Sequence, residues 1–139
     1  MEILLVEDNP VDVMITRDAL YAGNLCHNLH VAEDGEEAMD FLYKRGRFAS
    51  VPSPEIVLLD LNLPRKDGRE VLADMKNDPE LQHIPVIVLT TSASEEDIRT
   101  SYELHANCFI TKPSDVDQFR RVIELLGTFW STMVKLPIK

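Results

Sequence analysis

The sequence predicts an α/β fold in which a parallel β-sheet is covered by helices on both faces. Five short segments of β-type composition alternate with helical patterns along the 139 residues, and such alternation is typical of parallel sheets. The third segment, Ile56–Leu59, consists of four consecutive large aliphatic residues. This composition suits a strand that is buried on both faces. Right-handed crossovers between the strands limit the possible topologies to a few.

Each expected strand is followed by a helix that has its own start signal. The strands are Ile3–Val6, about Leu29–Ala32, Ile56–Leu59, Val86–Leu89 and Cys108–Ile110. The helix starts are Asn9 before Pro10, Asp34 with Glu37, Asp67 with Glu70, Ser94 with Asp97, and Ser114 with Asp117. Most of these pairs place an acid three residues after a capping side chain, which is a signature of a helix N-terminus. The segment Arg45–Pro54 contains Pro and Ser and is expected to be an exposed connection.

Length and charge limit the classes of protein to which the chain can belong. With 139 residues it is expected to form one domain that folds alone. Fourteen basic and 24 acidic residues give a formal charge of −10, which argues against nucleic-acid binding. The N-terminus is too short for a signal sequence, and no apolar stretch approaches the ~20 residues of a membrane helix. Cys26 and Cys108 have no framework spacing, so we expect reduced thiols and a cytoplasmic protein.

Polar residues follow four of the five expected strands. They are Glu7 and Asp8 after the first, Asp60 after the third, Thr90 and Thr91 after the fourth, and Lys112 after the fifth. In open α/β sheets, ligands bind beyond the carboxyl ends of the strands, where the direction of winding reverses. Three carboxylates converge there if the first and third strands are neighbours. Each residue alone is more often a turn, helix-start or surface residue, but their joint placement favours a binding site.

Clustered carboxylates require a counter-charge, because each disfavours the ionised form of the others. The candidate ligands of a cation are the side chains of Glu7, Asp8 and Asp60 and the main-chain carbonyl of Asn62. Oxygen donors without nearby Cys or His favour Mg²⁺, or Mn²⁺, over zinc. Lys112 adds a positive charge and Thr90 a hydroxyl, and both suit phosphate oxygens. We therefore predict that Asp60 accepts a phosphoryl group.

The segments "VED", "LLDLNLP", "LTTS" and "ITKP" occur in this order within residues 1–127, and in them the chain resembles the receiver domains of two-component response regulators. The resemblance implies a flavodoxin-like, doubly wound sheet of five parallel strands in the order 2-1-3-4-5, flanked by five helices. The roles that it implies are Asp60 as phosphoacceptor, Glu7 and Asp8 as acidic pocket residues, Thr90 as switch hydroxyl, Lys112 as phosphate partner and Phe109 as switch aromatic. Two positions depart from the commoner pattern. Glu7 replaces Asp, which points to a water-mediated metal contact, and Phe109 lacks the hydroxyl of Tyr.

Residues 128–139 form a C-terminal extension beyond the receiver domain of residues 1–127. Apolar residues recur at 116, 119, 122, 123, 125, 126, 129, 130, 133 and 134, and this stripe is too wide for one core-facing side of a helix. The extension either folds back over its own sheet or covers another surface, and we predict the second, as a homodimer contact. The predicted contact residues are Phe129, Trp130, Met133 and Val134. This ending and the long loop after the second helix resemble the small stand-alone regulators paired with cyanobacterial phytochromes.

Three functions are compatible with these residues. The first, which we predict, is a signalling protein that accepts a phosphoryl group from a sensor histidine kinase, in the narrower resemblance a phytochrome. It is not an enzyme for external substrates, and its output is contact with another protein, because no output domain follows. The second is a Mg²⁺-dependent phosphohydrolase, but haloacid dehalogenase enzymes usually keep an acid where this chain has Asn62. The third is an adaptor that is never phosphorylated, which would not need Asp8, Asp60, Thr90 and Lys112 together.

Overall fold

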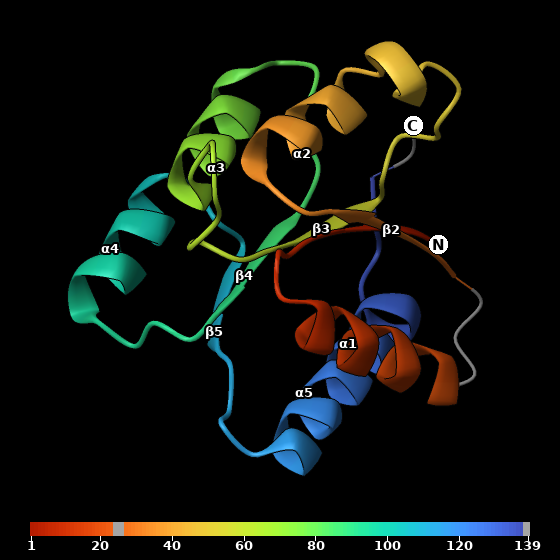
Figure 1. Ribbon diagram of the computed structural model, residues 1–139, viewed down its shortest axis with the longest axis vertical. Coiled ribbons are helices and arrows are strands. Elements are labelled where there is room, and N and C mark those ends of the chain that lie inside the picture. The colour runs from red at the N-terminus through yellow and green to blue at the C-terminus, as the bar shows by residue number, and fades with distance from the viewer. Residues whose placement is uncertain (24–26, 138–139) are drawn as a thin grey trace.

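The five strands form one parallel sheet in the order β2-β1-β3-β4-β5 (Figure 1). The computed structural model describes residues 1–23 and 27–137. The strands are β1 (Glu2–Val6), β2 (Asn28–Ala32), β3 (Ile56–Leu59), β4 (Val86–Thr90) and β5 (Cys108–Thr111). Leu4 of β1 lies opposite His30 of β2 on one side and Val57 of β3 on the other. The predicted doubly wound sheet is confirmed, and its winding reverses between β1 and β3.

Capping side chains begin the five α-helices. The helices are α1 (Pro10–Ala22), α2 (Gly35–Leu42), α3 (Gly68–Asn77), α4 (Glu95–Glu103) and α5 (Val116–Thr128). Four predicted caps are confirmed, since Asn9, Asp34, Asp67 and Ser94 accept backbone N–H groups at their helix starts. The prediction of Ser114 as the fifth cap is wrong. Asp115 accepts the N–H of Gln118 instead, because α5 begins one residue later than expected.

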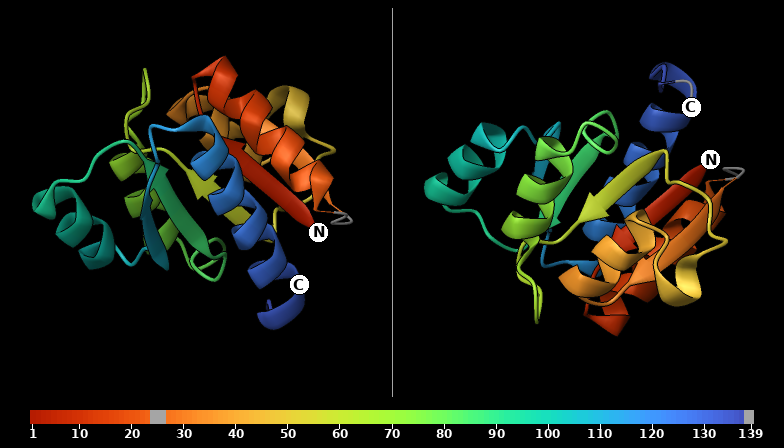
Figure 2. Two further views of the ribbon diagram at one scale, coloured as in Figure 1. Left: turned by 90° about the horizontal axis from the view of Figure 1, so that it is seen from below. Right: turned by 90° about the horizontal axis from the view of Figure 1, so that it is seen from above.

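Helices cover both faces of the sheet, with α1 and α5 side by side on one face and α2 and α3 on the other (Figure 2). Successive strand residues point to opposite faces. Leu59 therefore packs in the cluster formed with α2 and α3, whereas its neighbour Leu58 packs in the cluster formed with α1 and α5. All four residues of β3 are buried, which confirms that this strand is covered on both sides.

Helix α4 contributes less to the core than the other helices. Its one buried residue is Ser101, whereas α3 buries four residues. Apolar burial is the main force that fixes a helix on a sheet. Polar contacts therefore have a larger share in deciding where α4 lies.

Two further predictions concern the loops and the cysteines. The segment Arg45–Pro54 contains a 3-10 turn, Gly46–Phe48, and Phe48 packs against the core, so this connection is only partly exposed. Cys108 is half-buried, and burial raises the pKa of its thiol; Cys26 lies outside the described residues. Within the described part of the chain, no helix is both long and apolar enough to cross a bilayer.

Candidate functional site

Three carboxylates meet at the carboxyl edge of the sheet. Glu7 and Asp8 follow β1, Asp60 follows β3, and their carboxylate oxygens lie within 4.8 Å of one another. The strand order explains this, because β1 and β3 are adjacent where the winding reverses. Glu7 and Asp60 are 3% and 8% exposed, whereas Asp8 is exposed to solvent.

Backbone contacts hold the turn that carries Asp60. The N–H of Asp60 donates to the carbonyl of Val6 at 3.1 Å, and the N–H of Asn62 donates to Asp60 Oδ1 at 3.1 Å. The N–H of Gly68 donates to the carbonyl of Leu61 at 2.9 Å. A Cβ atom on Gly68 would lie 2.2 Å from the carbonyl oxygen of Asp60. Glycine is therefore required where α3 approaches the turn.

The ammonium group of Lys112 is the positive charge in this cluster. Its Nζ atom contacts three carboxylates, those of Glu7, Asp12 at 3.0 Å and Asp60 at 3.1 Å. The side chain is buried, and burial by itself lowers the pKa of Lys112. The surrounding carboxylates outweigh this effect, so the pKa lies above its ordinary value and Lys112 is charged.

Asp12 is a member of the cluster that sequence reasoning missed. It lies in the first turn of α1, four residues after Asp8. The sequence therefore showed that Asp12 is close to the acid pair, although it did not show the contact with Lys112. A carboxylate in the first turn of a helix that starts at this edge lies near the edge. Its contact with Lys112, however, depends on how α1 and β5 are placed in the fold.

The electrostatics of the cluster suit a divalent cation. Burial raises the pKa of Glu7 to about 7; the ammonium of Lys112 opposes this shift, and the charge of Asp60 adds to it. The site thus holds four carboxylates and one ammonium group, which contacts three of them. All of the available donors are oxygen atoms, which are the ligands that Mg²⁺ and Mn²⁺ prefer. The residues present therefore fit such an ion.

Thr90 lies on β4, next to β3, and Phe109 lies on the edge strand β5, which pairs with β4. Thr90 ends β4 and is fully buried, and its Oγ1 atom has no hydrogen-bond partner among the described residues. Such a group is unusual, because most buried hydroxyls are paired. Phe109 lies opposite Val88 in β5 and is half-buried against the core. Its N–H donates to the hydroxyl oxygen of Tyr102 on α4 at 3.2 Å.

The residues predicted for a dimer contact lie far from this cluster. They belong to the π-helical turn Phe129–Met133 and to Val134, which follow α5 directly. Phe129 and Met133 are 49% and 72% exposed. Trp130 is half-buried in the apolar cluster shared by α1 and α5, and it lines a small cavity with Met1. Figure 2 likewise shows the end of α5 near the N-terminus of the chain. Trp130 thus folds back on its own domain, whereas Phe129 and Met133 remain in solvent.

Comparisons with known proteins agree with this geometry. The family model described as response regulator receiver domain matches residues 3–124. The response regulator Rcp1 of Synechocystis sp. is 45% identical over 135 residues, which cover 97% of this chain and 92% of that protein.

Solved structures give the same result. The Mn(2+)-bound form of Rcp1 superimposes with a TM-score of 0.95 at 44% identity, over 99% of both chains. The phosphorylated cyanobacterial phytochrome response regulator RcpA has a TM-score of 0.95 at 45% identity, over 99% of this chain and 98% of that chain. RPA3017, a response regulator in red light signaling of R. palustris, has a TM-score of 0.90 at 35% identity. With its fold, its acidic cluster and a family match over most of its length, this chain belongs to the response regulator receiver domain family.

Proposed function

We propose that Asp60 accepts a phosphoryl group from the phosphohistidine of a sensor histidine kinase, and that the phosphorylated chain signals through contacts with another protein. One observation carries the proposal. A buried carboxylate at the carboxyl edge of the sheet contacts the ammonium of Lys112 and lies within 4.8 Å of two further carboxylates. The reaction takes place in the cytoplasm, which suits the half-buried thiol of Cys108.

The proposed step moves phosphorus from nitrogen to oxygen. A carboxylate oxygen of Asp60 forms a P–O bond while the P–N bond to imidazole breaks. The imidazole keeps the electron pair of that bond and leaves as a neutral ring, because its other nitrogen carries a proton. Lys112, already 3.1 Å from Asp60 Oδ2, neutralises the charge of the transferred phosphoryl oxygens.

Glu7, Asp8, Asp60 and the main-chain carbonyl of Asn62 would hold Mg²⁺ or Mn²⁺. When bound, such an ion supplies positive charge to the oxygens of the phosphoryl group. The protein contributes the donor oxygens, and the backbone N–H of Asn62 orients the carboxylate of Asp60 through its 3.1 Å contact with Oδ1.

Thr90 and Phe109 are the proposed switch. After phosphorylation, the hydroxyl of Thr90 moves toward the new oxygens and gains a hydrogen-bond partner, which it lacks among the described residues. Phe109 then turns inward and changes the surface formed by α4, β5 and α5. Thr90→Ala should still accept the phosphoryl group but lose the phosphorylation-dependent change of this surface.

The kinase partner in this proposal is a phytochrome. The support comes from the similar proteins, since RcpA is described as a phytochrome response regulator and RPA3017 acts in red light signaling. Mixing the chain with a phosphorylated phytochrome kinase and an unrelated histidine kinase would test this pairing. Faster transfer from the phytochrome supports it, and equal rates contradict it.

A homodimer through the C-terminal extension completes the proposal, with Phe129, Trp130, Met133 and Val134 at the contact. Phe129 and Met133 expose large apolar side chains, and burying such a side chain fully stabilises by about 1.5–3 kcal/mol. Trp130 supports the contact from the core side, because it packs in its own domain. A two-fold arrangement would cover both copies of the surface at once.

The enzyme alternative is a phosphohydrolase that turns over phosphate esters. It requires an acid that protonates the leaving group, and Asn62, two residues after Asp60, has a neutral amide. The adaptor alternative predicts no phosphorylation at all. Labelling with acetyl phosphate separates the three functions, because they predict one stable phosphoryl group per chain, continuous turnover, or no reaction.

The labelling experiment uses wild type, Asp60→Asn and Asp117→Asn in Mg²⁺ and in EDTA. Asp117 is an exposed carboxylate in the first turn of α5, so its variant controls for the loss of one charge. We expect Mg²⁺-dependent labelling of wild type and Asp117→Asn and none of Asp60→Asn. Undiminished labelling of Asp60→Asn overturns the assignment.

A further inference from the structure

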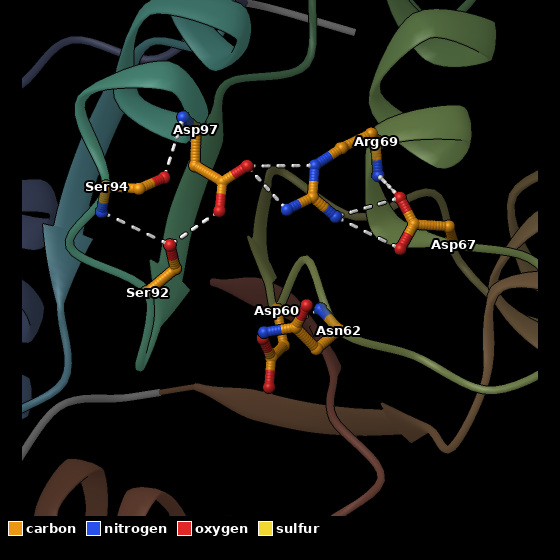
Figure 3. Close-up of polar contacts among 7 residues, drawn as sticks. All are labelled: Asp60, Asn62, Asp67, Arg69, Ser92, Ser94 and Asp97. Atoms are coloured by element: carbon orange, nitrogen blue, oxygen red, sulfur yellow. Dashed lines mark hydrogen bonds and ion pairs between the residues drawn. The ribbon is translucent and has the colours of Figure 1, made fainter.

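The guanidinium group of Arg69 connects the beginnings of α3 and α4 (Figure 3). Its Nε and Nη2 atoms donate to Asp97 Oδ1 on α4 at 3.2 and 2.6 Å. Its Nη1 atom donates to both carboxylate oxygens of Asp67, the cap of α3, at 3.2 Å. We call Arg69, Asp97 and Ser92 the Arg69 clamp, because the carboxylate of Asp97 also accepts the hydroxyl of Ser92.

One end of the clamp holds the loop that follows Thr90. Ser92 lies two residues after Thr90, and its Oγ atom donates to Asp97 Oδ2 at 2.5 Å. The backbone N–H of Asp97 donates to Ser94 Oγ, the cap of α4, at 3.1 Å. Arg69 and Ser92 therefore meet on the same carboxylate from opposite sides.

The other end of the clamp begins at the turn of the phosphoacceptor. Gly68, the residue before Arg69, approaches the carbonyl of Asp60 so closely that no Cβ fits between them. A continuous series of contacts thus runs from the turn of Asp60 through Arg69 and Asp97 to the loop of Thr90. Of the residues of α4 only Ser101 is buried. Little apolar packing therefore fixes the position of α4, and these polar contacts have a large share in fixing it.

The clamp occurs together with a particular state of Thr90. In the same structure, the buried hydroxyl of Thr90 has no partner among the described residues. A movement of Thr90 toward Asp60 would shift the loop and Ser92 relative to α3, and the clamp opposes such a shift. The two observations belong to one conformation of the loop, in which Thr90 is not engaged.

We propose that Arg69 and Asp97 are positioning residues for Thr90, which hold the loop between β4 and α4 in the conformation with a disengaged hydroxyl. The inference rests on the proposed function, because engagement means a hydrogen bond from Thr90 to a phosphoryl group on Asp60. Breaking the clamp makes engagement easier. The clamp thereby shifts the equilibrium of the loop toward the conformation in which Thr90 is disengaged, without contacting the reacting atoms.

Binding of beryllofluoride, an analogue of the phosphoryl group, tests this inference. Because the analogue stabilises the engaged loop, a variant with a larger engaged population must bind it more tightly. We expect Arg69→Gln and Asp97→Asn to bind beryllofluoride in Mg²⁺ roughly threefold more tightly than wild type, as suits a partly exposed ion pair. The double variant should bind no more tightly than either single variant, because both remove one interaction. Titration followed by ¹⁹F NMR measures the affinities.

Two controls separate positioning from a general effect on structure. Arg99 and Glu103 form an exposed ion pair within α4, with 3.8 Å between Arg99 Nε and Glu103 Oε1. Arg99→Gln breaks this pair and should leave the affinity for beryllofluoride unchanged. In a Thr90→Ala background, Arg69→Gln should give no gain, because no hydroxyl is left to engage. A merely structural role would weaken binding, and it would do so whether or not Thr90 is present.

The outcomes distinguish this inference from the proposed function. A wild type that binds no beryllofluoride and is not labelled at Asp60 overturns both. If wild type binds and the clamp variants bind equally well or more weakly, the clamp alone is overturned. A gain that persists in Thr90→Ala also overturns it, since the effect would then not act through Thr90.

Discussion

The Nζ atom of Lys112 lies 3.0 Å from Asp12 Oδ2, although the two residues are 100 positions apart in the chain. Asp12 stands on α1 and outside the group of Glu7, Asp8 and Asp60. It therefore gives the lysine a partner that is not itself needed as a ligand. In the proposed function, Lys112 and a divalent cation would compete for the oxygens of Glu7 and Asp60, and Asp12 would reduce this competition.

Asp12→Asn should weaken Mg²⁺ binding by roughly two- to fivefold. The variant removes one negative charge near the cluster, and Lys112 then interacts more strongly with Glu7 and Asp60. Calorimetric titration with Mg²⁺ measures the change. Asp18→Asn, on the same helix but exposed, is the matched control and should bind as wild type does. Equal affinity of Asp12→Asn and wild type contradicts the prediction.

Thr90→Val should leave the free energy of unfolding unchanged or raise it by up to about 1 kcal/mol. Valine has the shape of threonine, and the hydroxyl that it replaces is buried without a partner in the described part of the chain. The variant should still be labelled at Asp60 but should not switch. Ser101→Ala removes a second buried hydroxyl that has no partner within residues 1–23 and 27–137, and this variant should keep the switch. Urea unfolding and labelling measure both properties, and a loss above about 1 kcal/mol in Thr90→Val would reveal a structural hydrogen bond.

Mg²⁺ should stabilise the folded chain, and removal of Mg²⁺ with EDTA should reverse the effect. An ion that binds only the folded state at ten times its Kd stabilises by about 1.4 kcal/mol. It also relieves the repulsion among Glu7, Asp8 and Asp60, which lie within 4.8 Å of one another. The shift of the urea midpoint with Mg²⁺ is the measurement. Asp8→Asn should lose most of this shift, and a shift of the same size in that variant would place the ion elsewhere.

The Arg69 clamp should stabilise the fold at neutral pH and lose its effect in acid. The hydroxyl of Ser92 and then the guanidinium of Arg69 hold the pKa of Asp97 below its ordinary value of 3.8. A carboxyl whose pKa is lower in the folded state contributes stability above the unfolded pKa and loses it as the pH falls through the folded pKa. The difference in unfolding free energy between wild type and Asp97→Asn should therefore shrink as the pH is lowered below about 4. A difference that is independent of pH contradicts an ionic role.

Substitutions in the C-terminal extension should have two different effects, because Phe129 and Met133 are exposed and Trp130 packs against its own domain. Phe129→Asp and Met133→Asp change exposed side chains and should abolish the proposed dimer while leaving the unfolding free energy nearly unchanged. Trp130→Asp should also destabilise the monomer by about 3 kcal/mol or more, because it puts a charge into the apolar cluster of α1 and α5. Sedimentation and urea unfolding distinguish the two effects. Weak dimers have dissociation constants of roughly tens of micromolar. A wild type that stays monomeric at such concentrations contradicts the dimer proposal.

Local chemistry explains why much of this protein could be predicted from its sequence. The apolar run Ile56–Leu59 requires cover on both faces, and Asn9, Asp34, Asp67 and Ser94 satisfy backbone groups only a few residues away. Because parallel strands end at one edge of the sheet, the residues that follow them could be assigned to one site before their distances were known. Even the wrong prediction of Ser114 as a cap missed the observed cap, Asp115, by a single position.

Contacts between helices could not be predicted in this way, because they depend on distances that no local pattern specifies. Asp12 reaches Lys112 only because α1 begins at the edge of the sheet where β5 ends. Arg69 reaches Asp97 only because the first turns of α3 and α4 lie close together. The stripe of apolar residues after Phe119 indicated more surface than one helix face can bury, but periodicity does not say which side chain turns inward. The packing of α5 against α1 decided this, since Trp130 packs partly buried against their shared cluster and Phe129 and Met133 stay in solvent. The sequence alone thus determined the elements and the chemistry at their ends, and the tertiary structure decided which distant side chains share a charge or a cavity.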